Sequence, residues 1–164
     1  MKNINHILIV FFSLLSTMIC TSCMKNTDDD FYFRDALVEF DIATTTTNAP
    51  DRTYPLLSAR ARNAGVVSYR INLLGQQLDT DQELTIRVLA ENSTAQEGLH
   101  YSLPNGNTVT LRANSSTAEF QVNILDFPRQ SVGGPVVAVF EIVGNDRVKP
   151  SQNYKAIGVQ ISLR

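Results

Sequence analysis

The 164-residue sequence is poor in the side chains that catalysis and metal binding use most: it contains two histidines, two cysteines and no tryptophan. Both cysteines and His6 lie within the first 23 residues, so His100 is the one histidine in the rest of the chain. A Ser–His or Cys–His triad would have to be assembled around His100 alone, and a zinc site would lack ligands. We therefore expect a protein that is not an enzyme and that holds no cofactor and no metal.

Two paired carboxylates suffice for a glycosidase, but the sequence contains no recognisable cleft motif that would indicate such a pair. Glu39, Glu83, Glu119 and Glu141 occupy outward or mid-strand positions, where charged side chains usually face solvent. The formal net charge is −2. This balance argues against a nucleic-acid partner, because a surface that binds nucleic acid is basic.

The apolar run near the start of the chain is too short for a membrane span. Ile7 to Leu15 is almost entirely apolar and is interrupted only by Ser13, whereas a spanning helix needs roughly 20 apolar residues. The run follows Lys2, and a positive start before a short apolar stretch is typical of a secretory signal. We interpret residues 1–22 as a signal peptide and exclude them from the fold.

The end of this signal resembles the lipobox of bacterial lipoproteins. The small residues Thr21 and Ser22 directly precede Cys23, which would carry the lipid after cleavage. Cys20 is the poorer candidate because bulky Ile19 precedes it, and Cys20 itself stands where the lipobox has a large aliphatic residue. A buried cysteine behaves as a small hydrophobe, so it can fill that position. The alternative is an ordinary secreted protein with an unpaired thiol.

Three consecutive aspartates, Asp28, Asp29 and Asp30, follow Cys23 closely. They resemble the acidic export signal that sends lipoproteins of Bacteroidetes-type bacteria to the outer face of the outer membrane. The alternative is a solvated tether, which short charge runs usually are. We expect residues 23–34 to form a lipid anchor and acidic tether, with palmitate-type acyl chains on the cysteine and the outer membrane as partner. The expected location is the cell surface.

The remaining residues, 35–164, alternate between apolar and polar side chains in a period of two, as strands with one buried face do. About seven strands are predicted, and their side chains Phe40, Ile71, Ile86, Phe120 and Phe140 are expected in one core. This number is typical of an all-β, immunoglobulin-like antiparallel sandwich. The segments are 36–43, 66–75, 83–90, 108–112, 118–125, 135–144 and 156–164.

Two segments depart from simple alternation. Residues 135–144 are apolar on both sides except for Glu141, which predicts a central strand. The stretch from Thr44 to Ala64 is longer than most connections, and long loops in compact domains are often functional. Within it, Tyr54, Leu56 and Leu57 could form an additional edge strand, with Pro55 excluding a central position.

Ser93 to Asp126 resembles the central signature of Calx-beta-like domains. A threonine-alanine pair, a glycine and an aromatic precede a strand, a small-residue turn, a second strand and an aspartate. Together with "INLLGQ" upstream, this pattern is similar to a family of small Bacteroidetes lipoproteins that is known as a domain of unknown function. The resemblance implies a Calx-beta-like sandwich over residues 35–164 and specifies no chemistry.

The resemblance raises the question of calcium, which Calx-beta domains of the calcium-binding kind hold among loop carboxylates. Calcium takes six to eight oxygen ligands. His100 stands where an acidic residue usually precedes the aromatic, Tyr101, and after the strand only Asp126 remains. Glu91 and Glu97 are scattered acids that do not complete a site. We therefore expect no specific calcium site, and we expect Tyr101 to anchor its loop in the core.

A binding module is the remaining functional hypothesis, with a glycan or an outer-membrane protein as partner. Exposed aromatic rings would stack on sugars, and arginines would give the long loop a basic character suited to an acidic glycan. The alternative function is a structural or assembly subunit of a surface complex or fimbria. The candidate rings are Tyr54, Phe127 and Tyr154, and the candidate arginines are Arg52, Arg60 and Arg62.

Overall fold

A computed structural model describes residues 35–129 and 133–164 of the chain. The predicted signal peptide, the lipidation site Cys23 and the aspartates Asp28 to Asp30 lie outside the described residues. No helix in the described part is long and apolar enough to cross a membrane.

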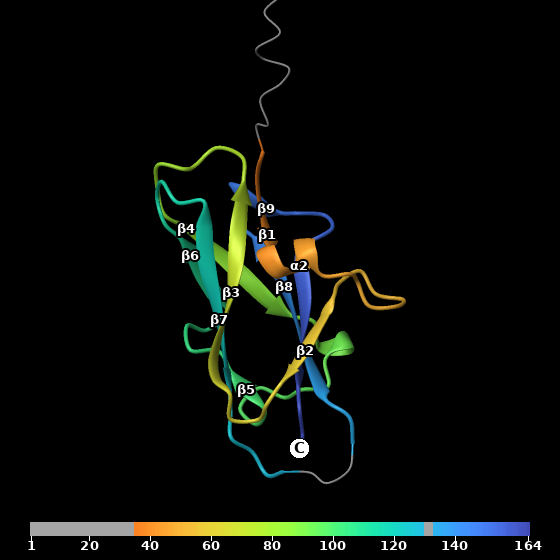
Figure 1. Ribbon diagram of the computed structural model, residues 1–164. Coiled ribbons are helices and arrows are strands. Elements are labelled where there is room, and N and C mark those ends of the chain that lie inside the picture. The colour runs from red at the N-terminus through yellow and green to blue at the C-terminus, as the bar shows by residue number, and fades with distance from the viewer. Residues whose placement is uncertain (1–34, 130–132) are drawn as a thin grey trace, which may run out of the picture. The chain divides into compact units, whose positions relative to one another are not determined.

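Two five-stranded sheets face each other within the described residues (Figure 1). In sheet A the strand order is β5 (Tyr101–Ser102), β7 (Thr117–Ile124), β3 (Gly65–Leu74), β1 (Ala36–Phe40) and β9 (Val148–Pro150). In sheet B the order is β2 (Leu56–Arg60), β10 (Ala156–Ile161), β8 (Val136–Gly144), β4 (Gln82–Val88) and β6 (Thr108–Leu111). A short helix α2 (Asp41–Thr45) and a 3-10 turn η3 (Ala90–Asn92) complete the described elements.

The predicted all-β sandwich is confirmed, and each of the seven expected segments contains a strand. Three short strands were not among the seven: β2, which the sequence suggested as an edge strand, β5 and β9. The sheets are not wholly antiparallel, because β9 pairs with β1 and β2 pairs with β10 in the parallel direction. The central position of β8, between β10 and β4, agrees with its apolar sequence.

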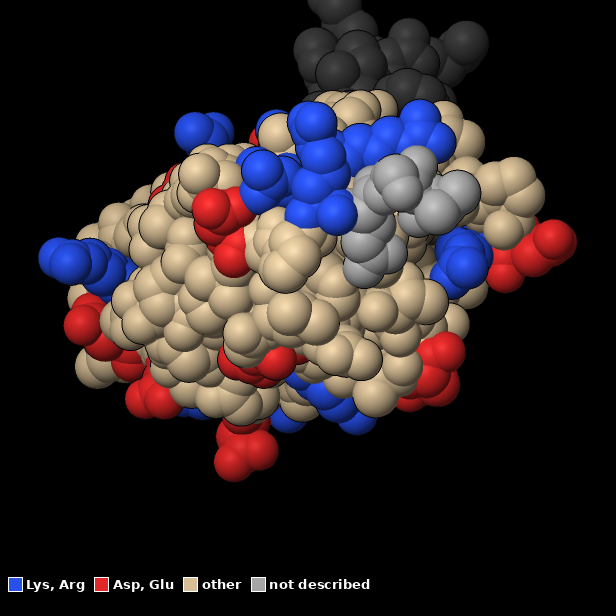
Figure 2. Space-filling view, turned by 90° about the horizontal axis from the view of Figure 1, so that it is seen from below, with Lys and Arg blue, Asp and Glu red and all other residues tan. Residues whose placement is uncertain are grey.

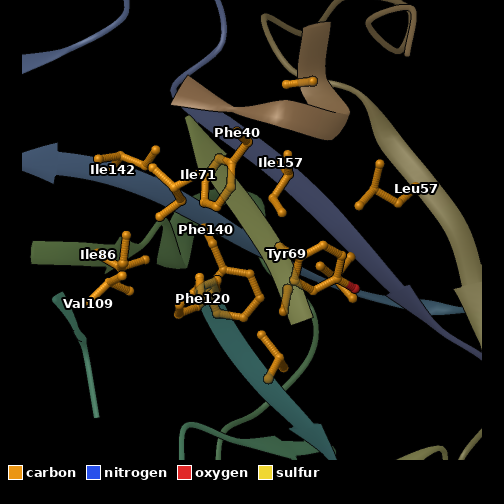
Figure 3. Close-up of a cluster of buried hydrophobic side chains, with 14 of the residues drawn as sticks. Phe40, Leu57, Tyr69, Ile71, Ile86, Val109, Phe120, Phe140, Ile142 and Ile157 are labelled. Atoms are coloured by element: carbon orange, nitrogen blue, oxygen red, sulfur yellow. The ribbon is translucent and has the colours of Figure 1, made fainter. Parts of the chain in front are cut away.

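The five predicted core side chains lie in one cluster between the sheets (Figure 3). The ring of Phe120 is central to it, 6.1 Å from the ring of Phe40 and 5.0 Å from the ring of Phe140. Tyr101 also packs edge-on against Phe140 at 5.5 Å, as expected of a loop anchor, and burial raises its pKa to about 12. These tilted contacts are the geometry that aromatic pairs prefer.

The expectation that the glutamates face solvent is wrong for Glu141 and Glu39, which are each 7% exposed. Glu141 lies on the outer face of β8, where Arg87 and Lys155 both pair with its carboxylate. Burial alone would raise the pKa of Glu141, but the bonds from Arg87 and Lys155 outweigh burial and lower it. The pattern of alternation could not reveal these partners, because Arg87 comes from β4 and Lys155 from the turn before β10.

The first strand is shorter than its sequence predicts. Alternation placed Ile42 inward, yet β1 ends at Phe40, and Ile42 lies in α2 with 37% of its surface exposed. The hydroxyl of Thr44 donates to the carbonyl of Asp41 at 2.8 Å. Such local side-chain bonds compete with a strand ladder. As a result β1 pairs with β3 only as far as Phe40 opposite Ile71, and the rest of that edge of β3 is left without β1.

Replacing Phe120 by Ala should lower the free energy of unfolding by about 3–5 kcal/mol, because the ring is 1% exposed and its removal leaves a cavity between the sheets. Urea denaturation followed by circular dichroism measures this. Val66→Ala is the matched control on an exposed position of β3, where a change within about 0.5 kcal/mol is expected. A loss below about 1 kcal/mol for Phe120→Ala would contradict its central place in the core.

Candidate ligand-binding cleft

Only one of the three predicted exposed rings is at the surface. Tyr154 is 38% exposed, whereas Tyr54 is 4% and Phe127 is 5% exposed. Tyr54 packs with Val139 and Ala156 in a small cluster separate from the main core. Phe127 contacts the ring of His100 edge-on, with 5.0 Å between centroids. The expectation of exposure is therefore wrong for Tyr54 and Phe127, because both rings fasten loops onto the sandwich and cannot stack on a sugar.

Two of the three predicted arginines also fasten loops. Arg52 donates a hydrogen bond to the hydroxyl of Tyr54, and its guanidinium lies 5.6 Å from the centroid of that ring. Arg62 pairs with the carboxylate of Asp126 and donates to the carbonyl of Phe127 at 3.1 Å. Their functional groups are thus engaged within the domain.

Arg60 differs because a β-bulge redirects it. In the pairing of β2 with β10, Leu57 lies opposite Val159 and Arg60 lies opposite Ile161, so β2 uses one more residue than β10 over this stretch. Leu57, Val159 and Ile161 all belong to the core cluster between the sheets. A bulge of this kind re-aims the side chain that follows it. Arg60 therefore lies opposite Ile161 at the end of β2, and the residue is exposed.

A cleft of about 370 Å³ lies at the edge of β3 that β1 leaves open. We call it the side cleft. Its size is within the range of small-molecule sites, roughly 300–1,000 Å³. In Figure 1, α2 and β2 lie on the same side of β3. The side cleft is lined by Asp41 and Ile42 from α2, Arg60 from β2, Ser68, Tyr69 and Arg70 from β3, and Glu119 from β7.

Tyr69 brings a buried hydroxyl to the floor of the side cleft. Its side chain is 4% exposed, its Oη is closed to solvent, and no described residue bonds to that oxygen at normal hydrogen-bond distance and angle. Figure 3 shows the hydroxyl directed away from Phe120 and Phe140. Burial raises the pKa of Tyr69, and the guanidinium of Arg60, which lies close enough to lower the pKa through hydrogen bonding and charge, offsets this only in part. At neutral pH the hydroxyl is therefore protonated.

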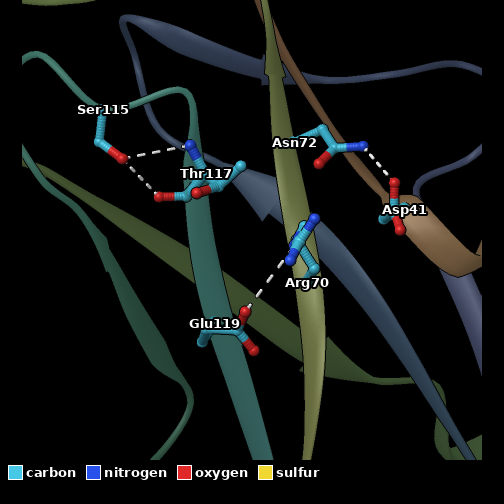
Figure 4. Close-up of polar contacts among 6 residues, drawn as sticks. All are labelled: Asp41, Arg70, Asn72, Ser115, Thr117 and Glu119. Carbon is cyan, nitrogen blue, oxygen red and sulfur yellow. Dashed lines mark hydrogen bonds and ion pairs between the residues drawn. The ribbon is translucent and has the colours of Figure 1, made fainter.

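The two acids of the side cleft already have partners (Figure 4). Glu119 pairs with Arg70 at 4.0 Å, and the carboxylate of Asp41 accepts a hydrogen bond from the side-chain amide of Asn72 at 2.8 Å. Arg60 makes no ion pair with any described residue. The guanidinium of Arg60 is therefore the charged group of the side cleft that has no ion pair within the described part of the chain.

The side cleft offers groups that bind polar ligands. Its lining consists of arginine, aspartate, glutamate, serine, tyrosine and isoleucine side chains, and its acids are bonded as described. Within residues 35–129 and 133–164, no three His, Cys, Asp or Glu side chains gather as metal ligands would. The Asp126 carboxylate, the one acid expected after the strand, is paired with Arg62. What the arrangement can do chemically is hold a polar ligand through hydrogen bonds and charge.

The sequence pointed to Arg60 but not to its neighbours in the side cleft. Tyr69 was assigned to the core by alternation, and Asp41 was read as an outward strand residue. The signal that could have found the site is the hydroxyl itself, because a tyrosine at an inward strand position brings a polar group that needs a partner.

The domain is similar to Calx-beta domains of known structure. It aligns with CBD12 from CALX1.2 with a TM-score of 0.54 and 12% identity, covering 77% of this chain and 44% of that one. The chain therefore spans less than half of that structure. The apo-form Calx CBD1 domain gives a TM-score of 0.50 and 11% identity, covering 76% and 96% of the two chains. At such identities the likeness shows the fold alone, a Calx-beta-like sandwich.

A two-domain protein of unknown function from Bacteroides fragilis also aligns, with a TM-score of 0.48 and 9% identity over 79% of this chain and 46% of that one. The family described as a domain of unknown function, DUF4843, matches residues 40–162. Because this range covers most of the sequence, the chain belongs to that family. No curated protein matches it. The Calx-beta-like fold and the family of unknown function that the sequence suggested are thus confirmed.

Replacing Tyr69 by Phe should leave the fold intact and raise the free energy of unfolding by about 1 kcal/mol, because an unpartnered buried hydroxyl costs about 1–3 kcal/mol. Urea denaturation measures the difference. Tyr101→Phe, a second buried tyrosine of the core, serves as the comparison. A clear loss of stability in Tyr69→Phe would show that the hydroxyl already has a partner within the domain.

Proposed function

We propose that this chain is a non-catalytic binding module that captures a polysaccharide at the cell surface. The observation that carries the proposal is the side cleft, in which the guanidinium of Arg60 makes no ion pair with any described residue. A guanidinium carries five N–H donors and no acceptor. A sugar, which is rich in hydroxyl oxygens, supplies acceptors for these donors.

The inventory of the side cleft supports binding without catalysis. A glycosidase would need one carboxyl group to protonate the leaving oxygen and a second to act on the sugar or on water. Glu119 and Asp41 come from different elements, and each is bonded to a neighbouring side chain, Arg70 and Asn72. The side cleft therefore presents no pair of unengaged carboxyl groups for that chemistry.

The alternative function, an assembly subunit, would use an open strand edge to add a strand from a partner. The start of β7 argues against such an addition. The N–H of Leu73 donates to the carbonyl of Ser116, so the backbone N–H and carbonyl of the next residue, Thr117, point away from β3. There the hydroxyl of Ser115 accepts from the N–H of Thr117 and donates to its carbonyl (Figure 4). These bonds occupy the groups that an added strand would use.

Affinity electrophoresis in gels that contain single plant or host polysaccharides tests the binding function. We expect at least one polymer to retard the domain, and Ser68→Trp, which fills the side cleft from an exposed position of β3, to abolish the retardation. Thr110→Trp is the control, because Thr110 is an exposed residue that lines a different groove, between β6 and β7. Absence of retardation by every polymer, together with co-purification in a large complex, would contradict capture and favour assembly.

The proposal includes a lipid anchor at Cys23 and surface export through Asp28, Asp29 and Asp30. Cys23→Ser should release the protein from the membrane fraction, because acyl chains on that thiol provide the anchoring energy. Cys20→Ser is the control and should remain bound. Replacing the three aspartates by Asn should keep the lipid but protect the domain from protease added to intact cells. Unchanged protease access in the Asn variant would show that the aspartates are only a tether.

A further inference from the structure

We infer that the side cleft recognises a carboxylate-bearing sugar, with the carboxylate held by the guanidinium of Arg60, which the buried hydroxyl of Tyr69 adjoins. This inference rests on the proposed function and names the class of its ligand. The bulge of β2 places Arg60 opposite Ile161 of β10, and Arg60 and Tyr69 both line the side cleft.

The charges of the side cleft select an anion. Its two acids are engaged, Glu119 by Arg70 and Asp41 by Asn72, whereas Arg60 has no counter-ion among the described residues. The guanidinium of Arg60 therefore keeps N–H donors for a ligand. A planar guanidinium binds a carboxylate through two parallel hydrogen bonds, which are stronger than the bonds a neutral hydroxyl oxygen would accept.

The rim of the side cleft limits the ligand to one negative charge at this point. Asp41 and Glu119 retain carboxylate oxygens that would repel a second anionic group but would accept hydrogen bonds from ligand hydroxyls. A single carboxylate surrounded by hydroxyl groups is the pattern of a uronic acid. The volume of about 370 Å³ suits one or two sugar units rather than a folded partner.

The surface around the end of β2 suits the next units of an acidic polymer. The N–H of Ser162 donates to the carbonyl of Arg60, which brings the last strand to the end of β2, and Arg62 bonds to the carbonyl of Phe127. Two further exposed arginines, Arg129 and Arg164, follow these segments by two residues each. Figure 2, which views this end of the domain, shows blue Lys and Arg side chains gathered on one part of it.

The test uses three uronic-acid polymers, polygalacturonate, alginate and hyaluronan, each beside its carboxyl-reduced form, in which the acid has become a neutral alcohol. Affinity electrophoresis and calorimetry with oligomers of the same polymers measure binding. We expect at least one acidic polymer to bind and its reduced form to bind at least tenfold more weakly. Arg60→Gln should weaken binding at least tenfold, in line with the loss of a charge-assisted hydrogen bond.

Arg112→Gln is the control for overall charge, because Arg112 lines the groove between β6 and β7 and not the side cleft; it should bind like the unmodified domain. Equal binding of acidic and reduced polymers, or no effect of Arg60→Gln, would overturn the acidic-sugar inference while leaving the binding module in place. Arg60-dependent binding of dextran sulfate without binding of any uronic-acid polymer would overturn the carboxylate assignment. Failure of every acidic and neutral polymer would overturn both the inference and the proposed function.

Discussion

The contact of Phe120 with Phe40 and Phe140 is the interaction on which the rest of the domain depends. Phe40 and Phe120 belong to sheet A and Phe140 belongs to sheet B, so the ring of Phe120 joins the two layers. The chain after Cys23 has no cysteine, so no disulfide can take over this task. Burial of apolar surface between the sheets must therefore supply the stability of the sandwich. The loops and the side cleft are positioned only as firmly as this core holds the strands.

The side cleft shows how one irregularity in each sheet can create a site in a regular fold. In sheet A the chain coils into α2 after Phe40, which opens the edge of β3. In sheet B the bulge of β2 places Arg60 opposite Ile161 of β10. Either irregularity alone would leave the site incomplete, because an open edge without Arg60 lacks charge and Arg60 without an open edge lacks space. The two irregularities affect the fold only locally, because apolar side chains fill the main core on the other side of Tyr69.

Alternation located seven of the ten described strands because the period of two follows directly from burial of one face. It placed Phe40, Ile71 and Phe120 correctly in the core. It failed at Ile42, where threonine hydroxyls favour a helical turn, and at Glu141, whose partners Arg87 and Lys155 come from β4 and from the turn before β10. The candidate site was found only in part for the same reason. Arg60 was noticed by its charge, but its approach to Tyr69 depends on a bulge and on the end of a strand, which are properties of pairing between distant segments.

The bulge in β2 also bears on how relatives of this domain could differ. The side chain that β2 presents to the side cleft is determined by the number of residues between Leu57 and Arg60, because side chains in a strand alternate between its two faces. A relative with one residue fewer in this stretch would present a different side chain at the same place, without any substitution in the cleft itself. Within such a family, changes of length in an edge strand would alter the ligand as effectively as changes of residue type. Alignments that treat gaps in this strand as neutral would overlook the difference.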